Sequence, residues 1–345
     1  MASKPRKQVS LKLIALAAIF VILAIIPIFV ESPYELSLII SVGMYSILAM
    51  TFILILRTGL ITLGVAAFWG VGAYTSAMMV TKAGMSFWIA LPASAIITGI
   101  FALIVGLLFC RTGGFSFVIM TMLINLLFVV AVGSTKWLGG YQGIVGIPAP
   151  DPINLPFLPP ITFASSHTQY YLLLLILIIV VVILSSVYAS SIGRAWNAIG
   201  LNDQLASTLG INVFKYRVMA FVLASTLVGL VGSFYAHFVG VIRPEAFNIF
   251  KTIYVHIYAI LGSVLHAFLG PAVGSAVLVY FPELISKTRE IEPIITGLLL
   301  ILLMIFLPAG LLSLPVVRAF ATDPRGAMGK AVKAIKSLPS RRGAR

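Results

Sequence analysis

Charged residues are scarce in this chain. Asp, Glu, Lys and Arg make up only 9% of its 345 residues, whereas 61% are hydrophobic. A soluble domain of this length needs far more charge to cover its apolar surface, so the composition excludes a water-soluble globular protein. A helix that crosses a bilayer needs about 20 mainly apolar residues, and several such runs are present. The sequence therefore predicts an all-α fold, a polytopic bundle of transmembrane helices.

Cysteine and the common catalytic motifs are equally scarce. The single cysteine, Cys110, excludes an intrachain disulfide and any metal site built from several cysteines. We interpret it as a small apolar residue near the end of a span, and we expect no metal site. The chain contains no GxxxxGKS or GxxxxGKT phosphate loop, no HExxH and no GxSxG. We therefore expect no enzymatic activity and no cofactor in this chain, so active transport would need an ATPase on another subunit.

Ten apolar runs are predicted to cross the membrane. They are residues 11–30, 36–56, 60–81, 87–109, 115–134, 169–189, 214–239, 252–267, 271–286 and 293–314. The runs 252–267 and 271–286 are short, and the sequence "HAFLGP" separates them. These two runs fit either two tilted spans or a re-entrant hairpin. In both cases the pattern predicts one transmembrane domain over residues 11–317.

The basic residues predict the orientation of the bundle. If the N-terminus is cytoplasmic, 17 of the 23 Lys and Arg residues fall on the cytoplasmic side. They are those before residue 13, those from residue 318 onward, and Arg57, Arg111, Arg194, Lys215 and Arg217. The positive-inside rule then predicts that both termini, residues 1–10 and the tail 318–345, are cytoplasmic. The net charge of +14 is explained by contact of the tail with anionic lipid or water, and no nucleic-acid partner is expected.

Two segments between the spans have unusual compositions. The outer loop, residues 135–168, contains six prolines: Pro148, Pro150, Pro152, Pro156, Pro159 and Pro160. Proline fixes φ and removes a backbone donor, so this loop is predicted to form a stiff cap without a long helix. The polar segment, residues 193–216, falls on the cytoplasmic side.

Ionisable groups are almost absent from the predicted spans. His256 and Glu283 are the main candidates, and Glu283 lies near a predicted outer end. A charge inside the membrane normally marks a proton or ion pathway, so its absence argues against a proton-driven carrier. His256 fits either a hydrogen-bonded histidine of the bundle or a pathway residue.

Polar and aromatic residues of the spans are candidates for a translocation pathway. They are Phe68, Tyr74, Thr75, Asn125 and His256. Glycines recur beside them, and small residues either allow helices to pack closely or mark a helix broken around a site. A helix broken near Gly70 and Gly72 would offer backbone donors to the carboxylate of an amino acid.

The polar segment has two faces when it is drawn as a helix. Ala195, Ile199, Ala206 and Leu209 share one stripe, and Asn202 falls on the same apolar side. Gly200 is predicted to split the segment into two short helices. Gly210 follows the stripe, where a helix end commonly needs a left-handed residue. A short two-faced helix between spans is typical of a segment that docks into a groove on a partner protein.

The sequence here resembles a known family. "RAWNAIGLNDQLASTLGINVFKYRVMAFVLAS" is similar to the cytoplasmic coupling loop of branched-chain amino acid permeases of ABC importers. "GLITLGVAAFWGVGAYTSA", "GGYQGIVGIP" and "LPAGLLSL" extend the resemblance over about residues 36–315. The resemblance implies a coupling loop at residues 190–213. The coupling residues that it implies are Gly193, Arg194, Asp203, Gln204, Ala206 and Gly210.

The resemblance also implies an assembly. The expected partners are a homologous second permease, two cytoplasmic ATPase subunits that hold ATP and Mg, an extracytoplasmic solute-binding protein, and membrane lipid. The expected location is the inner membrane of a prokaryote, and the expected solute is a branched-chain amino acid. Urea or another small solute, a stand-alone secondary transporter and a membrane scaffold that transports nothing remain alternatives.

Overall fold

The computed structural model describes residues 20–30, 32–153, 162–285, 297–298, 301 and 310–313. The predicted basic termini, the first part of the first predicted span (residues 11–19) and most of the last predicted span lie outside these residues. The chain divides into two compact units, Met1–His256 and Ile257–Arg345, and each is described by itself.

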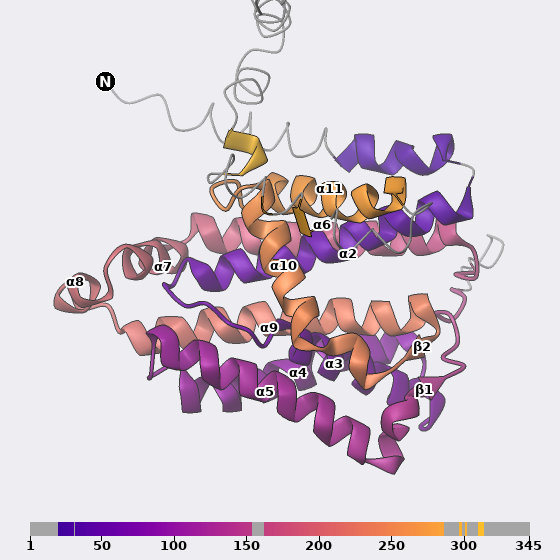
Figure 1. The fold of residues 1–345 in the computed structure, drawn as a ribbon, viewed down its shortest axis with the longest axis horizontal. Coiled ribbons are helices and arrows are strands. Elements are labelled where there is room, and N and C mark those ends of the chain that lie inside the picture. The colour runs from indigo at the N-terminus through magenta and orange to yellow at the C-terminus, as the bar shows by residue number, and fades with distance from the viewer. Residues whose placement is uncertain are drawn as a thin grey trace, which may run out of the picture. The chain divides into compact units, whose positions relative to one another are not determined.

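The first unit is a bundle of helices (Figure 1). Its helices are Phe20–Phe29, α2 (Pro33–Leu56), α3 (Val65–Thr81), α4 (Phe87–Phe109), α5 (Gly114–Ser134), α6 (Ser166–Ala189), α7 (Ser191–Leu201), α8 (Asp203–Thr208), α9 (Val213–Val239) and the start of α10 (Ile249–Gly262). Ser or Asn side chains cap the first turns of α2, α4, α6 and α9, which satisfies backbone donors that a helix start leaves free.

Five helices of the described residues are long and apolar enough to cross a membrane. They are α2, α4, α5, α6 and α9. Each matches a predicted span to within three residues at either end, so these five predictions are confirmed. The protein is therefore a multi-pass, all-α membrane protein.

Helix α9 forms the centre of the first unit, where it packs against α2, α3 and α4. The closest approach is at Gly72 of α3, where an added Cβ would lie 2.2 Å from the Gly229 carbonyl oxygen of α9. Helix α3 is continuous through Gly70 and Gly72, so the predicted helix break at these glycines is wrong. The two glycines serve close packing, the other of the two interpretations.

The predicted span 60–81 begins too early, because helix α3 starts only at Val65. Residues 60–64 are not helical, although Leu60, Thr62 and Gly64 are buried. Threonine hydroxyls accept from the backbone here: Thr121 Oγ1 from Leu63 N at 3.0 Å, Thr62 Oγ1 from Gly64 N at 3.2 Å, and Thr252 Oγ1 from Ala66 N at 3.0 Å. Buried backbone donors need such partners, so these hydroxyls allow a non-helical segment inside the bundle. We call residues 57–64 the α2–α3 connection.

The described part of the predicted outer loop forms a compact cap without a long helix, as its prolines indicate. It holds the 3₁₀ turns η1 (Lys136–Leu138) and η2 (Gly140–Gln142) and the strand β1 (Ile144–Val145). Strand β1 pairs antiparallel with β2 (Val241–Ile242), which follows α9 and precedes the turn η3 (Pro244–Phe247). This ribbon lies at the end of the first unit opposite α7 and α8 (Figure 1).

Hydrogen bonds attach the cap to the helices, among them those of Asp151 and His237. The Asp151 carboxylate accepts from Ser86 Oγ at 2.6 Å and from Phe87 N at 2.8 Å, at the start of α4. On α9, His237 Nδ1 donates to the Pro148 carbonyl at 2.7 Å, and its Nε2 accepts from the buried Ser76 hydroxyl of α3 at 3.0 Å. These bonds fix the neutral tautomer of His237, because a carbonyl can only accept.

In the second unit, the end of α10 packs on α11 (Leu269–Ile285) through glycine. A Cβ on Gly274 would lie 1.9 Å from the Tyr258 carbonyl oxygen, and one on Gly262 would lie 1.7 Å from that of Gly270. Helix α10, with 14 residues, extends roughly 21 Å, less than the ~30 Å of a bilayer core, and the described part of α11, with 17 residues, extends roughly 26 Å. The described residues of the second unit thus form a close-packed pair of helix segments.

Candidate functional site

The loop between α6 and α9, residues 190–213, is built from the two short helices α7 and α8. The chain breaks at Asn202, where φ is −163° and the side-chain oxygen accepts from Leu205 N at 2.9 Å. The prediction that Gly200 splits the segment is therefore wrong, since Gly200 lies inside α7. Asparagine is a favoured N-cap, so Asn202 starts a new helix and does not continue an apolar stripe.

Gly210 ends α8 in the left-handed conformation, with φ +83°, and this prediction is confirmed. The Gly210 N–H donates to the Ser207 carbonyl at 3.0 Å and the Ile211 N–H donates to the Ala206 carbonyl at 3.1 Å. This pair of bonds is the Schellman motif, which satisfies the last carbonyls of a helix and turns the chain away from its axis. The motif sets the direction in which the chain leaves α8 for α9.

The stripe predicted for this loop is only partly correct. Ala195, Ile199 and Ala206 are buried, but Leu209 is 73% exposed. Because the Asn202 break changes the helix axis, one helical wheel does not describe both helices. Leu201 and Leu205 are 88% and 60% exposed. We call Leu201, Leu205 and Leu209, which are spaced four residues apart, the leucine row.

The six predicted coupling residues occupy different places on this loop. Gly193 and Ala206 are buried against the protein, whereas Arg194, Gln204 and Gly210 are exposed. Asp203 forms an ion pair with Arg217 at the start of α9, with 3.0 Å between Oδ2 and Nη2. The buried Trp196 indole donates to the Tyr216 carbonyl at 2.9 Å. The loop is thus fixed to the bundle on one side and open on the other.

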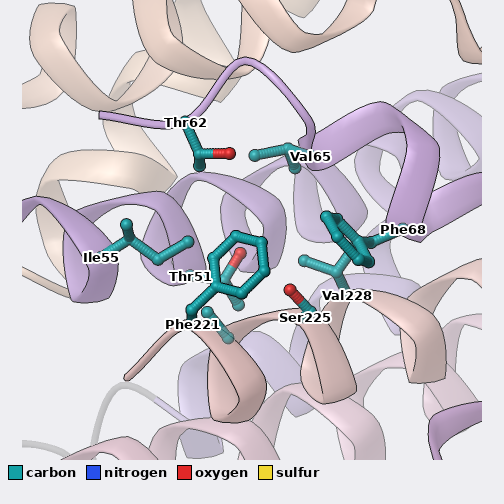
Figure 2. A pocket seen from close by; sticks show the side chains of 9 residues that line it. Thr51, Ile55, Thr62, Val65, Phe68, Phe221, Ser225 and Val228 are labelled. Carbon is teal, nitrogen blue, oxygen red and sulfur yellow. The ribbon is translucent and has the colours of Figure 1, made fainter. Parts of the chain in front are cut away.

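A cavity lies between α2, α3, α9 and the α2–α3 connection (Figure 2). It holds about 10 Å³, close to the room that a single water molecule needs, and is lined by Thr51, Ile55, Thr62, Val65, Phe68, Phe221, Ala224, Ser225 and Val228. Ligand sites typically measure roughly 300–1,000 Å³, so this space is far too small for a solute in the described structure. Three hydroxyl-bearing residues among apolar walls give it a weakly polar lining.

The predicted pathway residues do not converge on one site. Phe68 lines the cavity, whereas Tyr74 and Asn125 meet at Phe247 of η3. The Asn125 amide donates to the Phe247 carbonyl at 3.3 Å. His256 Nδ1 donates to the Thr252 carbonyl at 2.5 Å, and its ring lies 3.9 Å from that of Phe52.

Thr75 is half-buried on α3. None of the contacts described here joins it to the other four predicted pathway residues.

An aromatic cluster around Phe247 was not predicted. Trp69, Tyr74, Phe128 and Tyr235 all surround its ring, with centroid distances between 5.2 and 6.1 Å. The indole nitrogen of Trp69 and the hydroxyl of Tyr74 are buried without a hydrogen-bond partner in the described part of the chain. The sequence offers the pattern "FWGVGAY" as a signal, but Phe247 lies far along the chain and only the fold brings it there.

Comparison with known proteins gives one family. A family model described as "Branched-chain amino acid transport system / permease component" matches residues 35–308. Two curated relatives are each called "High-affinity branched-chain amino acid transport system permease protein LivM", one from Salmonella typhimurium and one from Escherichia coli K12. Both are 26% identical over 273 residues, which is 74% of this chain and 64% of each relative. No solved structure matches this chain.

Proposed function

The chain belongs to the family of permease components of branched-chain amino acid transport systems, and we propose that it is the transmembrane permease subunit of an ABC importer. Its partners are a homologous second permease, two ATPase subunits on the cytoplasmic side and an extracytoplasmic solute-binding protein. The solute is a branched-chain amino acid, as the name of the family and of both relatives states for those proteins. The membrane is the inner membrane of a prokaryote.

The leucine row is the observation that carries the proposal. Three large apolar side chains at 88%, 60% and 73% exposure stand on a loop whose other side is fixed to the bundle. Leu205 of α8 and Leu209 at its C-cap are four residues apart, and Leu201 ends α7 just before the Asn202 break. Exposed apolar side chains on a short helix are typical of a segment that docks into a groove of a partner protein. We propose that this groove belongs to an ATPase subunit.

The transport mechanism that we propose requires two states of the bundle, one open outward and one open inward. ATP binding closes the ATPase pair, which moves α7 and α8, and this movement shifts the bundle between outward and inward access. Helix α9 directly follows the loop and packs against α2, α3 and α4, so it is the element that distributes the movement.

The orientation of the bundle is testable by labelling. The basic residues place the 190–213 loop inside and the 135–168 cap outside. With Cys110 replaced by Ala, a membrane-impermeant maleimide added to intact cells should label Ala164→Cys and leave Thr208→Cys unlabelled. Both positions are exposed, so access to the compartment decides the result. Labelling of Thr208→Cys from outside, or protection of Ala164→Cys, contradicts this orientation.

The energy source is the decisive test of the proposal. Within α2, α4, α5, α6 and α9, Glu35 in the first turn of α2 is the only acidic residue. Buried carboxylates commonly carry proton coupling in membrane proteins, and these five helices contain none. Glu283→Gln in α11 should therefore keep leucine uptake within about threefold of the native chain, whereas removal of the ATPase should abolish uptake. Uptake that persists without an ATPase and stops when the proton gradient is collapsed selects a secondary transporter instead.

A further inference from the structure

Arg217 joins three parts of the first unit that are distant in sequence. It lies in the first turns of α9, and its side chain is only 11% exposed. Its Nη2 lies 3.0 Å from Asp203 Oδ2 of α8, and its Nε donates to the Thr58 carbonyl of the α2–α3 connection at 3.2 Å. Its Nη1 lies 3.4 Å from the position of a Cβ on Gly113, in the turn between α4 and α5. One guanidinium therefore bonds α8 and the α2–α3 connection and lies close to the α4–α5 turn.

The bond from Arg217 Nε to the Thr58 carbonyl is a contact with one defined acceptor atom. The last carbonyls of a helix have no partner within the helix, and cations near a helix C-terminus are favourable. Thr58 lies two residues beyond the end of α2, so Arg217 supplies a donor to the α2–α3 connection and a positive charge near the C-terminus of α2. The planar guanidinium presents several N–H groups in fixed directions, so it bonds Asp203 and Thr58 at once.

The α2–α3 connection leads from this bond to the cavity. It passes from Thr58 to Thr62, a residue of the cavity lining, and then to the start of α3 at Val65. Close to the Arg217–Thr58 hydrogen bond, the backbone of α7 also approaches the backbone of the α2–α3 connection. A Cβ on Gly200 of α7 would lie 2.4 Å from the Arg57 carbonyl oxygen. Movement of α7 and α8 is therefore applied directly to the non-helical segment.

The neighbouring Cys110 shows that the guanidinium is held in a largely dry place. Cys110 is 1% exposed at the end of α4. Burial raises the pKa of its thiol to about 12, and the positive charge of Arg217 partly opposes that shift. The Arg217 side chain is mostly buried whereas that of Asp203 is 48% exposed, so salt screens this ion pair only in part.

We propose that Arg217 is the positioning residue of the coupling step, because it ties Asp203 of α8 to the Thr58 carbonyl and so transmits movement of the 190–213 loop to the α2–α3 connection beside the cavity. The inference rests on the proposed function, since it assigns a route to the coupling that an ABC importer needs. The basic-residue pattern of the sequence explained Arg217 only by its side of the membrane.

The test uses the complete transporter in nanodiscs, with leucine and leucine-loaded binding protein as probes. Arg217→Gln removes the charge, and Asp203→Asn weakens the same link from a carboxylate that is 48% exposed. We expect Arg217→Gln to co-purify the ATPase at the native level and to keep basal ATP hydrolysis. Stimulation of hydrolysis by the loaded binding protein should fall at least tenfold in Arg217→Gln and at least threefold in Asp203→Asn. Arg217→Lys should also lose at least threefold, because an ammonium lacks the fork of a guanidinium.

A matched control is Lys215→Gln, which removes the same charge from an exposed residue two positions away and should keep stimulation within twofold. A second readout distinguishes transmission from mere stability: fluorescent labels at Thr208 of α8 and Ile61 of the α2–α3 connection. ATP binding should shift both signals in the native chain and only the Thr208 signal in Arg217→Gln. If Arg217→Gln lowers the yield of folded protein, Asp203→Asn decides the result by the same two readouts.

Native stimulation in Arg217→Gln and Asp203→Asn, or an unchanged Ile61 signal in the native chain, overturns the role of Arg217 and leaves the proposed function intact. A native transporter that assembles but gives no ATP-dependent leucine uptake overturns the proposed function itself.

Discussion

Gly72→Val is expected to prevent the accumulation of folded protein in the membrane. The new Cβ would lie 2.2 Å from the Gly229 carbonyl oxygen, and this neighbour is backbone at the centre of α9, so it has no rotamer by which to move aside. Overpacking in a core costs about 1–3 kcal/mol when side chains can adjust, and we expect a loss at or above the upper end of that range. Thermal unfolding in detergent, followed by size-exclusion chromatography, measures the effect.

The control is Gly297→Val, where an added Cβ meets no atom of the described residues within 4 Å. The same change of residue should there leave the unfolding temperature within a few degrees of the native protein. A Gly72→Val variant with native yield and native unfolding temperature would mean that α3 and α9 do not pack as closely as described.

Leu205→Glu is expected to separate the permease from its ATPase while the bundle stays folded. Leu205 is 60% exposed and lies in the middle of the leucine row, so the change adds a charge to solvent in the free subunit. In the assembled transporter that charge would have to enter an apolar groove without a partner, which is costly. Central apolar anchors of an interface contribute about 2 kcal/mol or more, so binding should weaken by more than roughly tenfold.

Co-purification of the ATPase with the permease and stimulated ATP hydrolysis measure this loss. Ser207→Glu places the same charge on the same helix, about 200° around the axis from Leu205, and should keep both quantities within twofold. Equal behaviour of the two variants would falsify the docking role of the leucine row, whereas loss of folded protein in Leu205→Glu alone would show that Leu205 is structural.

The sequence predicted the roles of Gly72 and Leu205 to different extents. Gly72 was visible in the sequence as one of several glycines, but the sequence left open whether it packs a helix or breaks one. Leu205 was not among the predicted residues. A single helical wheel across residues 193–216 placed Leu209, and not Leu205, on the apolar stripe. The Asn202 break rotates α8 relative to α7, and the leucines then face outward.

Hydropathy and local backbone chemistry were sufficient for the membrane class, for five spans, for the prolines of the cap and for the left-handed Gly210. Each of these properties depends on residues that are close in the chain: an apolar run of the length of a bilayer, a fixed proline φ, or a glycine that tolerates φ +83°.

Tertiary structure alone decided where α3 begins. The backbone N–H groups of Leu63 and Ala66 at its start donate to Thr121 and Thr252, which lie 58 and 186 residues further along the chain. It also decided that Asn125 and Tyr74 meet at Phe247 while Phe68 lines a separate cavity, and that Arg217 bonds Thr58, 159 residues away. Hydrogen bonds and ring contacts of this kind form between helices, so no pattern along one helix contains them.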